Sequence, residues 1–184
     1  MVHNSQKNQQ SNSHQKNWFS KLPDFIWAPF SAGLLILIVG LIGIVVGQPW
    51  LFPSLGPSAF LLVENPQLPS ARFYNIVVGH LIGLGAGCLA VIILNASDAP
   101  GVLSSNHLTL IRVWAALLAI VLNMIGVILA RASHPPSAAT TLLVALGGLK
   151  VTWQDALTVI IGVLLLAVFG EGLRLLRLAK KPFL

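Results

Sequence analysis

Four long apolar runs constrain what this 184-residue chain can fold into. They extend over residues 30–47, 74–94, 110–130 and 156–176. Each run reaches or approaches the ~20 residues that an α-helix needs to cross the ~30 Å hydrocarbon core of a bilayer. The sequence therefore predicts an all-α integral membrane protein with about four transmembrane helices.

The composition supports a bilayer as the solvent. Hydrophobic residues make up 55% of the chain and charged residues 9%, whereas about a quarter of the residues in a soluble domain are charged. The net charge of +6 comes mainly from the two ends of the chain, which the positive-inside rule places in the cytoplasm. No basic face interleaved with stacking aromatics is present, which argues against a nucleic-acid partner. The single cysteine, Cys88, excludes an internal disulfide and a cysteine-based metal cluster.

Three regions follow from these patterns. Residues 1–24 form a polar and basic tail, whose composition predicts a disordered cytoplasmic segment. Residues 25–178 hold the transmembrane domain, and residues 179–184 form a basic C-terminal tail. The N-terminal tail lacks the Arg-rich composition of a transit peptide, which favours a bacterial or cyanobacterial plasma membrane.

Two further apolar segments, residues 54–63 and 135–147, are too short to span a bilayer. As helices they would extend over only about 15 to 20 Å, and prolines with neighbouring serines mark their starts. Irregular backbone at membrane depth is tolerated where protein buries it or water lines it. The sequence therefore predicts two short re-entrant half-helices, one after each of the first and third long helices.

The two halves of the chain are similar. Pro57-Ser58-Ala59 recurs as Pro136-Ser137-Ala138, and the same offset superposes Gly83 on Gly162. Weak internal symmetry of this kind is typical of duplicated transporters, and with four crossings the two repeats would be parallel. One feature favours an alternative, because the connection over residues 95–109 would be cytoplasmic yet has no Lys or Arg. Six crossings would place it outside and make the repeats inverted; four crossings remain the prediction.

The starts of the half-helices are candidate anion sites. The first turn of a helix carries unpaired N–H groups and the positive end of the helix dipole, and hydroxyl side chains lie close to both starts. Uncharged donors suit a small, weakly hydrated monoanion, since weak binding allows conduction. The candidate substrate-binding residues are Ser54, Pro57, Ser58, His134, Pro136, Ser137, Thr140 and Thr141.

Two histidines are candidates for proton coupling. His134 precedes the two prolines and either takes up a proton or only caps the half-helix. His80 lies inside the second apolar run, where an ionisable residue is a functional candidate, although a neutral imidazole bonded to a neighbouring helix fits equally well. Glu171 and Arg174, three positions apart, are interpreted as a structural pair. No metal-ligand spacing, paired carboxylates or nucleophile elbow is present, so neither an enzyme nor a cofactor is expected.

The stretch Ser133-His134-Pro135-Pro136-Ser137-Ala138-Ala139-Thr140-Thr141 resembles the name-giving motif of the HPP family of small integral membrane proteins. The earlier stretch Phe52-Pro53-Ser54-Leu55-Gly56-Pro57-Ser58-Ala59 is similar to the other recurrent motif of that family. The resemblance covers roughly residues 25–175 and implies a four-helix membrane protein. Because relatives in cyanobacteria and plastid envelopes are implicated in nitrite transport, it also implies nitrite as the first substrate to test.

Two functions from different classes follow. The first is a transporter or channel for a small inorganic monoanion, with nitrite ahead of other ions. Four helices alone rarely enclose a pathway, so this function also predicts a homo-oligomer in the lipid bilayer. The alternative is a non-transporting membrane scaffold or assembly subunit, in which the helix-facing glycines of the second run provide packing surface.

Overall fold

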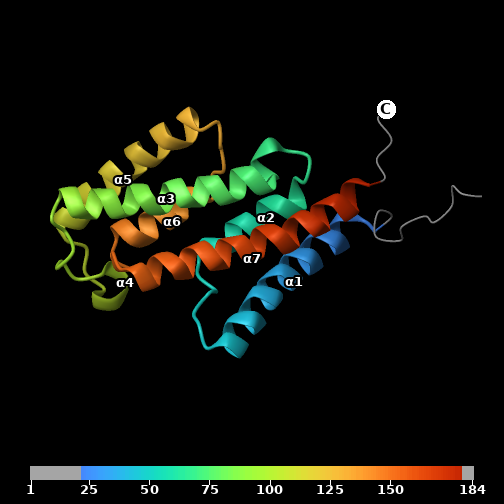
Figure 1. Cartoon of the computed structure of the whole chain (residues 1–184), viewed down its shortest axis with the longest axis horizontal. Coiled ribbons are helices and arrows are strands. Elements are labelled where there is room, and N and C mark those ends of the chain that lie inside the picture. Colours follow the sequence, from blue (N-terminus) through green and yellow to red (C-terminus); the bar gives the residue numbers. More distant parts are fainter. Residues whose placement is uncertain (1–21, 180–184) are drawn as a thin grey trace, which may run out of the picture.

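Four long apolar helices dominate the computed structural model, which describes residues 22–179 (Figure 1). They are α1 (Asp24–Val46), α3 (Phe73–Ile93), α5 (Leu110–Leu129) and α7 (Trp153–Leu178). The shortest has 20 residues and the longest 26, which corresponds to about 30 to 39 Å at a rise of 1.5 Å per residue. Each is long and apolar enough to cross a bilayer, so the prediction of an all-helical membrane protein with four such helices is confirmed.

The ends of two long helices differ from the prediction. The first helix begins at Asp24 rather than near residue 30, since Pro29 lies in its second turn and does not end it. The last helix begins at Trp153, because the Thr152 hydroxyl caps it by accepting the Asp155 N–H at 3.2 Å. Most of the two predicted tails, residues 1–21 and 180–184, lies outside the described residues.

Two short helices occupy the predicted short segments. Helix α2 (Leu55–Glu64) has 10 residues and α6 (Ser137–Ala145) has 9, and each follows a stretch of non-helical backbone. Helix α6 ends before Gly147, whose φ of 74° allows Gly148 N–H to donate to the Leu143 carbonyl at 2.8 Å. The remaining helical pieces are the 3-10 turn η2 (Pro69–Ala71) and the single turn α4 (Val102–Ser105).

The long helices do not alternate in direction along the chain. Arg177, in the last turn of α7, contacts Leu22 and Asp24 at the start of α1. Tyr74, at the start of α3, donates to the Ala130 carbonyl just after α5 at 3.0 Å. Helices α1 and α3 therefore run parallel to each other and antiparallel to α5 and α7 (Figure 1). The connection over residues 94–109 lies at the end of the bundle opposite the start of α1 and the end of α7.

This arrangement differs from the predicted path, in which each short segment returns to the side it came from and successive long helices alternate. Here residues 47–64 carry the chain from the end of α1 back toward the start of α3. Residues 130–145 do the same between α5 and α7. Each of these segments consists of a non-helical stretch followed by a short helix.

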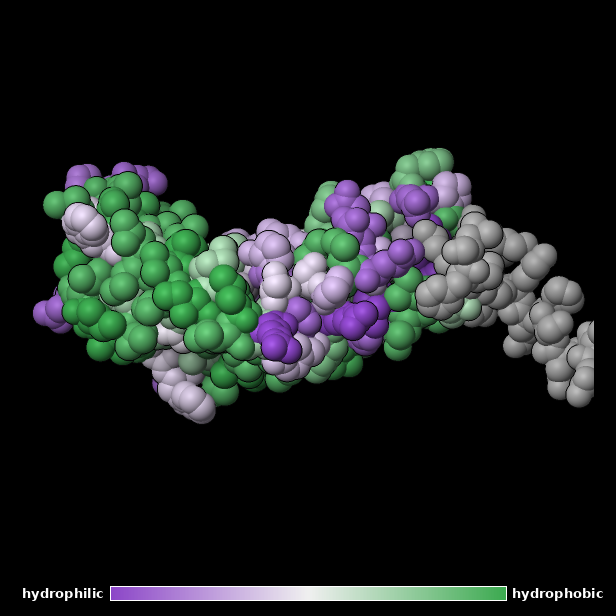
Figure 2. Space-filling view, turned by 90° about the horizontal axis from the view of Figure 1, so that it is seen from above, coloured by the Kyte–Doolittle hydropathy of each residue, from purple (hydrophilic) through white to green (hydrophobic). Residues whose placement is uncertain are grey.

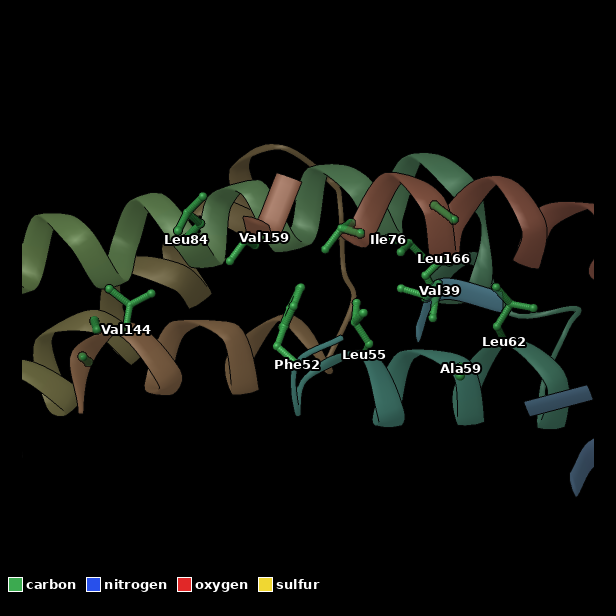
Figure 3. Packing of buried hydrophobic residues seen from close by; sticks show 14 of the residues in the cluster. Val39, Phe52, Leu55, Ala59, Leu62, Ile76, Leu84, Val144, Val159 and Leu166 are labelled. Carbon is green, nitrogen blue, oxygen red and sulfur yellow. The ribbon is translucent and has the colours of Figure 1, made fainter. Parts of the chain in front are cut away.

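Glycines on α3 and α7 allow the short segments to pack closely on these helices. A Cβ added at Gly83 would lie 2.7 Å from the Ser137 carbonyl oxygen, and one at Gly162 would lie 2.5 Å from the Trp50 carbonyl oxygen. Both distances are below van der Waals contact, so only glycine fits without a shift of backbone. Figure 3 shows the apolar packing that results, with α2 and α6 lying end to end beneath α3 and α7.

Apolar side chains also cover the outer surface. Figure 2 shows hydrophobic residues over the left part of the visible face, and hydrophilic residues among apolar ones from the middle to the right, with a few more at the left edge. Large exposed hydrophobic side chains are frequent on α1 and α5, for example Phe30, Leu37, Leu117 and Ile128. Lipid or another protein chain is the surrounding that such faces require.

Candidate functional site

The N-terminal ends of α2 and α6 meet in the interior of the bundle. Ser54, which immediately precedes α2, and Thr140, in the first turn of α6, are joined by a hydrogen bond of 2.7 Å between their hydroxyls. Both side chains are buried. The structure thus brings together two candidate residues that are 86 positions apart in the sequence.

His80 of α3 lies between the two short helices and contacts both of them. Its Nε2 lies 2.8 Å from the Ser58 hydroxyl of α2, and its Nδ1 lies 2.6 Å from the Thr140 hydroxyl of α6. The side chain has no exposed surface. Both ring nitrogens of one imidazole are therefore used to link the two short helices.

His134 joins the same group from the segment before α6. Its Nε2 lies 3.0 Å from the Ser58 hydroxyl, and its Nδ1 lies 2.8 Å from the Ser70 carbonyl oxygen. The centroids of the His80 and His134 rings are 5.0 Å apart. The side chain of His134 does not cap α6, because its two nitrogens bond to other segments.

When both imidazoles are neutral, the Ser70 carbonyl fixes the direction of every hydrogen bond in the series from Ser70 to Ser54. A carbonyl oxygen only accepts, so His134 Nδ1 carries the proton and its Nε2 accepts from the Ser58 hydroxyl. Ser58 in turn accepts from His80 Nε2–H, which leaves His80 Nδ1 to accept from Thr140. The Thr140 oxygen then accepts from Ser54. Each ring nitrogen in the chain has one partner, and Ser58 and Thr140 each donate once and accept once within it.

Ser137 and Thr141 lie on the same helix but take part in other contacts. Thr141 donates to the Ser137 carbonyl at 3.1 Å, within α6. The Ser137 hydroxyl accepts from the Asn123 amide of α5 at 3.4 Å, while the Asn123 carbonyl oxygen is buried without a partner among the described residues. The contact between Asn123 and Ser137 attaches α6 to α5.

The two prolines among the candidates differ in position. Pro136 is buried directly before α6, where its ring fixes φ for the first turn. Pro57 is exposed and lies at the third position of α2, so it neither starts that helix nor faces the hydroxyl group. Helix α2 begins at Leu55 after Ser54, close to the predicted start of the segment over residues 54–63, and Pro57 lies in its first turn.

Two polar contacts near the site were not predicted from the sequence. Ser70 belongs to η2, and its backbone carbonyl accepts from His134. The type of side chain at residue 70 does not indicate that role, because the acceptor is a backbone atom. Asn75, in the first turn of α3, donates to the Ser133 carbonyl at 3.1 Å and holds the segment before His134. Backbone acceptors of this kind depend on the path of the chain.

The electrostatic character of the site is positive without a formal charge. The N-terminus of a helix carries about half a positive elementary charge, and here two of them face each other. Neither imidazole bonds to an Asp or Glu among the described residues. Within residues 22–179 no group of three His, Cys, Asp or Glu side chains converges. The chemistry available is hydrogen-bond donation, proton relay through hydroxyls and imidazoles, and stabilisation of negative charge.

The fold and site define an integral membrane protein built from four long apolar helices and two short helices that meet at their N-terminal ends. The family model described as "HPP, transmembrane region" matches residues 19–179. The chain therefore belongs to the HPP transmembrane family. No curated protein and no solved structure matches the chain.

Proposed function

We propose that this protein is a membrane transporter or channel for a small inorganic monoanion, with nitrite as the first substrate to test. The observation that carries the proposal is the meeting of two helix N-termini at a buried group of uncharged hydroxyl and imidazole donors. Positive potential without a fixed cation stabilises an anion and still allows it to leave. Membership of the HPP family supports transport as the general class.

The directions of the helices support six passes through the bilayer, of which two are broken. Each broken pass combines a non-helical stretch with a half-helix, a construction found at the midplane sites of transporters. The end of the bundle that holds the start of α1 and the end of α7 also carries Arg72, Arg131, Arg174 and Arg177. By the positive-inside rule this end is cytoplasmic. The connection over residues 94–109, which has no Lys or Arg, then lies outside.

Corresponding contacts in the two halves support an inverted repeat. Gly79 of α3 faces the Ala132 carbonyl and His134, and Gly162 of α7 faces the Trp50 carbonyl and Phe52. The two members of each corresponding pair are separated by nearly the same number of residues. The pairs are Gly79 with Gly162, Trp50 with Ala132, and Phe52 with His134. The three helices of one half run in the direction opposite to their counterparts in the other half.

This correspondence pairs Ser58 with Thr140 rather than with Ser137. Ser58 and Thr140 have the same separation in sequence as Trp50 and Ala132, and both are buried on the inner face of a short helix. Ser58 bonds to Nε2 of His80 and Thr140 bonds to Nδ1 of the same ring. His80 therefore lies where the two halves meet, which is the place for a substrate or proton site in an inverted-repeat transporter.

A proton can enter the hydrogen-bonded chain through the rotation of one hydroxyl. Ser58 also lies 3.2 Å from the Ser54 carbonyl oxygen. When His134 takes up a proton, its Nε2–H donates to Ser58, and the Ser58 hydroxyl turns to donate to the Ser54 carbonyl. Every donor keeps an acceptor in both states, so His134 and His80 can couple anion movement to protons without a carboxylate.

The alternative is a non-transporting scaffold, and one observation favours it. The hydroxyls and ring nitrogens of the site bond to one another, so an anion has to displace part of this network. Hydrogen bonds that only hold the two half-helices together, as in a scaffold, would have the same contacts. The transport hypothesis therefore requires a second conformation, in which the half-helices separate, and the exposed apolar faces of α1 and α5 are where a homo-oligomer would form.

The test is nitrite flux into proteoliposomes that contain only this protein. We expect nitrite to move down its gradient, and Ser58→Ala to slow the flux at least about tenfold while Pro57→Ala leaves it nearly unchanged. Pro57 is the matched control because it neighbours Ser58 in α2 but is exposed. A null flux with verified insertion of the wild-type protein would leave the scaffold as the better account.

A further inference from the structure

Arg112 is a buried cation that has no carboxylate partner among the described residues. It lies in the first turn of α5, at the end of the bundle opposite the start of α1 and the end of α7, and is 3% exposed. Its guanidinium donates to three backbone carbonyls: Nε to Pro100 at 3.3 Å, Nη1 to Ala145 at 3.1 Å and Nη2 to Ala99 at 2.6 Å. A guanidinium has five N–H groups, so one N–H on each Nη atom is left for another acceptor.

Carbonyl contacts compensate only part of this charge. Ala145 is the last residue of α6, so its carbonyl belongs to the negative end of that helix dipole. A full positive charge removed from water normally requires a counter-charge as well. Within residues 22–179 no Asp or Glu bonds to Arg112, so its formal charge has no partner in that part of the chain.

A second arginine shows what a compensated site looks like in the same fold. Arg174 donates to the Pro66 carbonyl beyond the C-terminal end of α2, just as Arg112 donates to the Ala145 carbonyl at the C-terminal end of α6. Arg174, however, forms two hydrogen bonds to Glu171, at 2.6 and 2.7 Å. Helix α7 thus supplies a counter-ion at the end of one half-helix, and α5 supplies none at the end of the other.

A cavity of about 310 Å³ adjoins Arg112. Its lining is mixed. Val91, Val144, Leu149 and Val151 form an apolar part, and Arg112, Lys150, Ser97, Ser104 and Thr152 form a polar part that carries two positive charges. Asp98, between the lining residues Ser97 and Ala99, is exposed and is not part of the lining. Asp155 accepts the Lys150 backbone N–H at 2.7 Å and lies in the first turn of α7. The cavity therefore combines two cations with hydroxyl donors, and no carboxylate of the described residues lines it.

The backbone around the cavity holds the guanidinium in place. A Cβ added at Gly147 would lie 2.6 Å from Arg112 Nη2, and Gly147 has a φ of 74°. The Gly101 backbone lies against Gly147 in turn, since a Cβ there would be 2.5 Å from the Gly147 carbonyl oxygen. Glycine at both positions lets two loops close over the arginine, which preorganises its charge at the cavity wall.

We propose that this cavity binds a small inorganic monoanion, which supplies the counter-charge that Arg112 lacks. Arg112 provides the buried charge, and Lys150 with the Ser97 hydroxyl provides donors at the open side, since the Ser104 hydroxyl already donates to the Gly101 carbonyl. The site is separate from the His80 group and lies at the opposite end of α6. The identity of the ion as nitrite rests on the proposed function, whereas the binding site itself rests on the arginine and the cavity.

Binding can be measured without transport. The purified protein in detergent is titrated with sodium nitrite, with sodium gluconate keeping the ionic strength constant, and thermal unfolding is followed at each concentration. We expect a saturable rise in the unfolding temperature. Arg131→Gln is the matched control, because Arg131 is an exposed arginine in the loop after the far end of α5, and this variant is expected to bind like the wild type.

Two positions test the location. Lys150→Gln should weaken nitrite binding roughly threefold, as expected for one exposed charge, and Lys150→Glu should weaken it at least about tenfold. Arg112→Lys cannot bond to three carbonyls and an anion together, so it should abolish saturable binding if it folds; the Lys150 variants carry the test if it does not. The proposal would be overturned if both Lys150 variants had the same nitrite-titration midpoint as the wild type, or if nitrite caused no saturable rise in the unfolding temperature of the wild type. Binding without flux would leave this site intact and remove the transport proposal.

Discussion

Ser58→Ala is the perturbation whose effect the structure defines best. The Ser58 hydroxyl donates to His134 Nε2 and accepts from His80 Nε2–H, so alanine leaves two buried ring nitrogens without partners. An unsatisfied buried polar group costs about 1–3 kcal/mol. The loss is thus on the order of 3 kcal/mol, against a gain of only about 0.5 kcal/mol from the higher helix propensity of alanine.

Ser54→Ala provides the comparison within the same chain of hydrogen bonds. Ser54 is at its end and only donates to Thr140, which keeps its own donation to His80. Alanine at residue 54 therefore removes one hydrogen bond but leaves no ring nitrogen unsatisfied, with an expected cost of about 0.5–1.5 kcal/mol. Both serines are buried, so burial does not explain a difference between them.

The assay is thermal unfolding in detergent, followed by tryptophan fluorescence, for the wild type and both variants. We expect Ser58→Ala to lower the unfolding temperature at least twice as much as Ser54→Ala. Equal shifts for the two variants would refute the assigned direction of the hydrogen bonds, since that direction is what distinguishes the two serines. A Ser58→Ala protein as stable as the wild type would show that these hydrogen bonds do not hold the two short helices together.

Three other results follow from the fold. A topology reporter fused at Asn106 should score as external, because Asn106 lies in the connection opposite the start of α1 and the end of α7. A cytoplasmic score at Asn106, with both termini cytoplasmic, would contradict six passes. Gly83→Ala should destabilise the protein and slow nitrite flux, because its Cβ would lie 2.7 Å from the Ser137 carbonyl oxygen. Gly85→Ala is the control: a Cβ at residue 85 has nothing within 4 Å, so this variant should unfold at or above the wild-type temperature. Equal unfolding temperatures for the two variants would contradict the close packing at Gly83. His134→Gln should flatten the dependence of initial nitrite uptake on pH, because an amide does not titrate as an imidazole does. The variant should keep most of its stability, because the amide can still donate to the Ser70 carbonyl. A pH profile identical to that of the wild type would exclude His134 as the proton carrier.

The long helices were predictable because the length and apolar character of a segment decide whether it can span a bilayer. The starts of α3 and α5 agree closely with the prediction. The short helices were also predictable, because proline and serine before an apolar stretch favour a helix start. These are local properties, and the sequence within each segment determines them.

The site residues were recognisable by type, but their partners were not. Hydroxyls and histidines in apolar surroundings were singled out, and Ser54, Ser58, His80, His134 and Thr140 do lie together. Pro57 does not, because a helix that begins at Leu55 turns it outward. Which hydroxyl bonds to which nitrogen follows from where α2 and α6 begin relative to α3.

The sequence by itself determined that the chain is helical, suited to a membrane and interrupted by two short segments. The tertiary structure decided that α1 and α3 run in the same direction, that His80 contacts both Ser58 and Thr140, and that Arg112 lies beside a cavity without a counter-ion among the described residues. The physical reason is the distance in sequence: Ser54 and Thr140 are 86 positions apart. Their contact depends on the whole path of the chain between them, which no local pattern specifies.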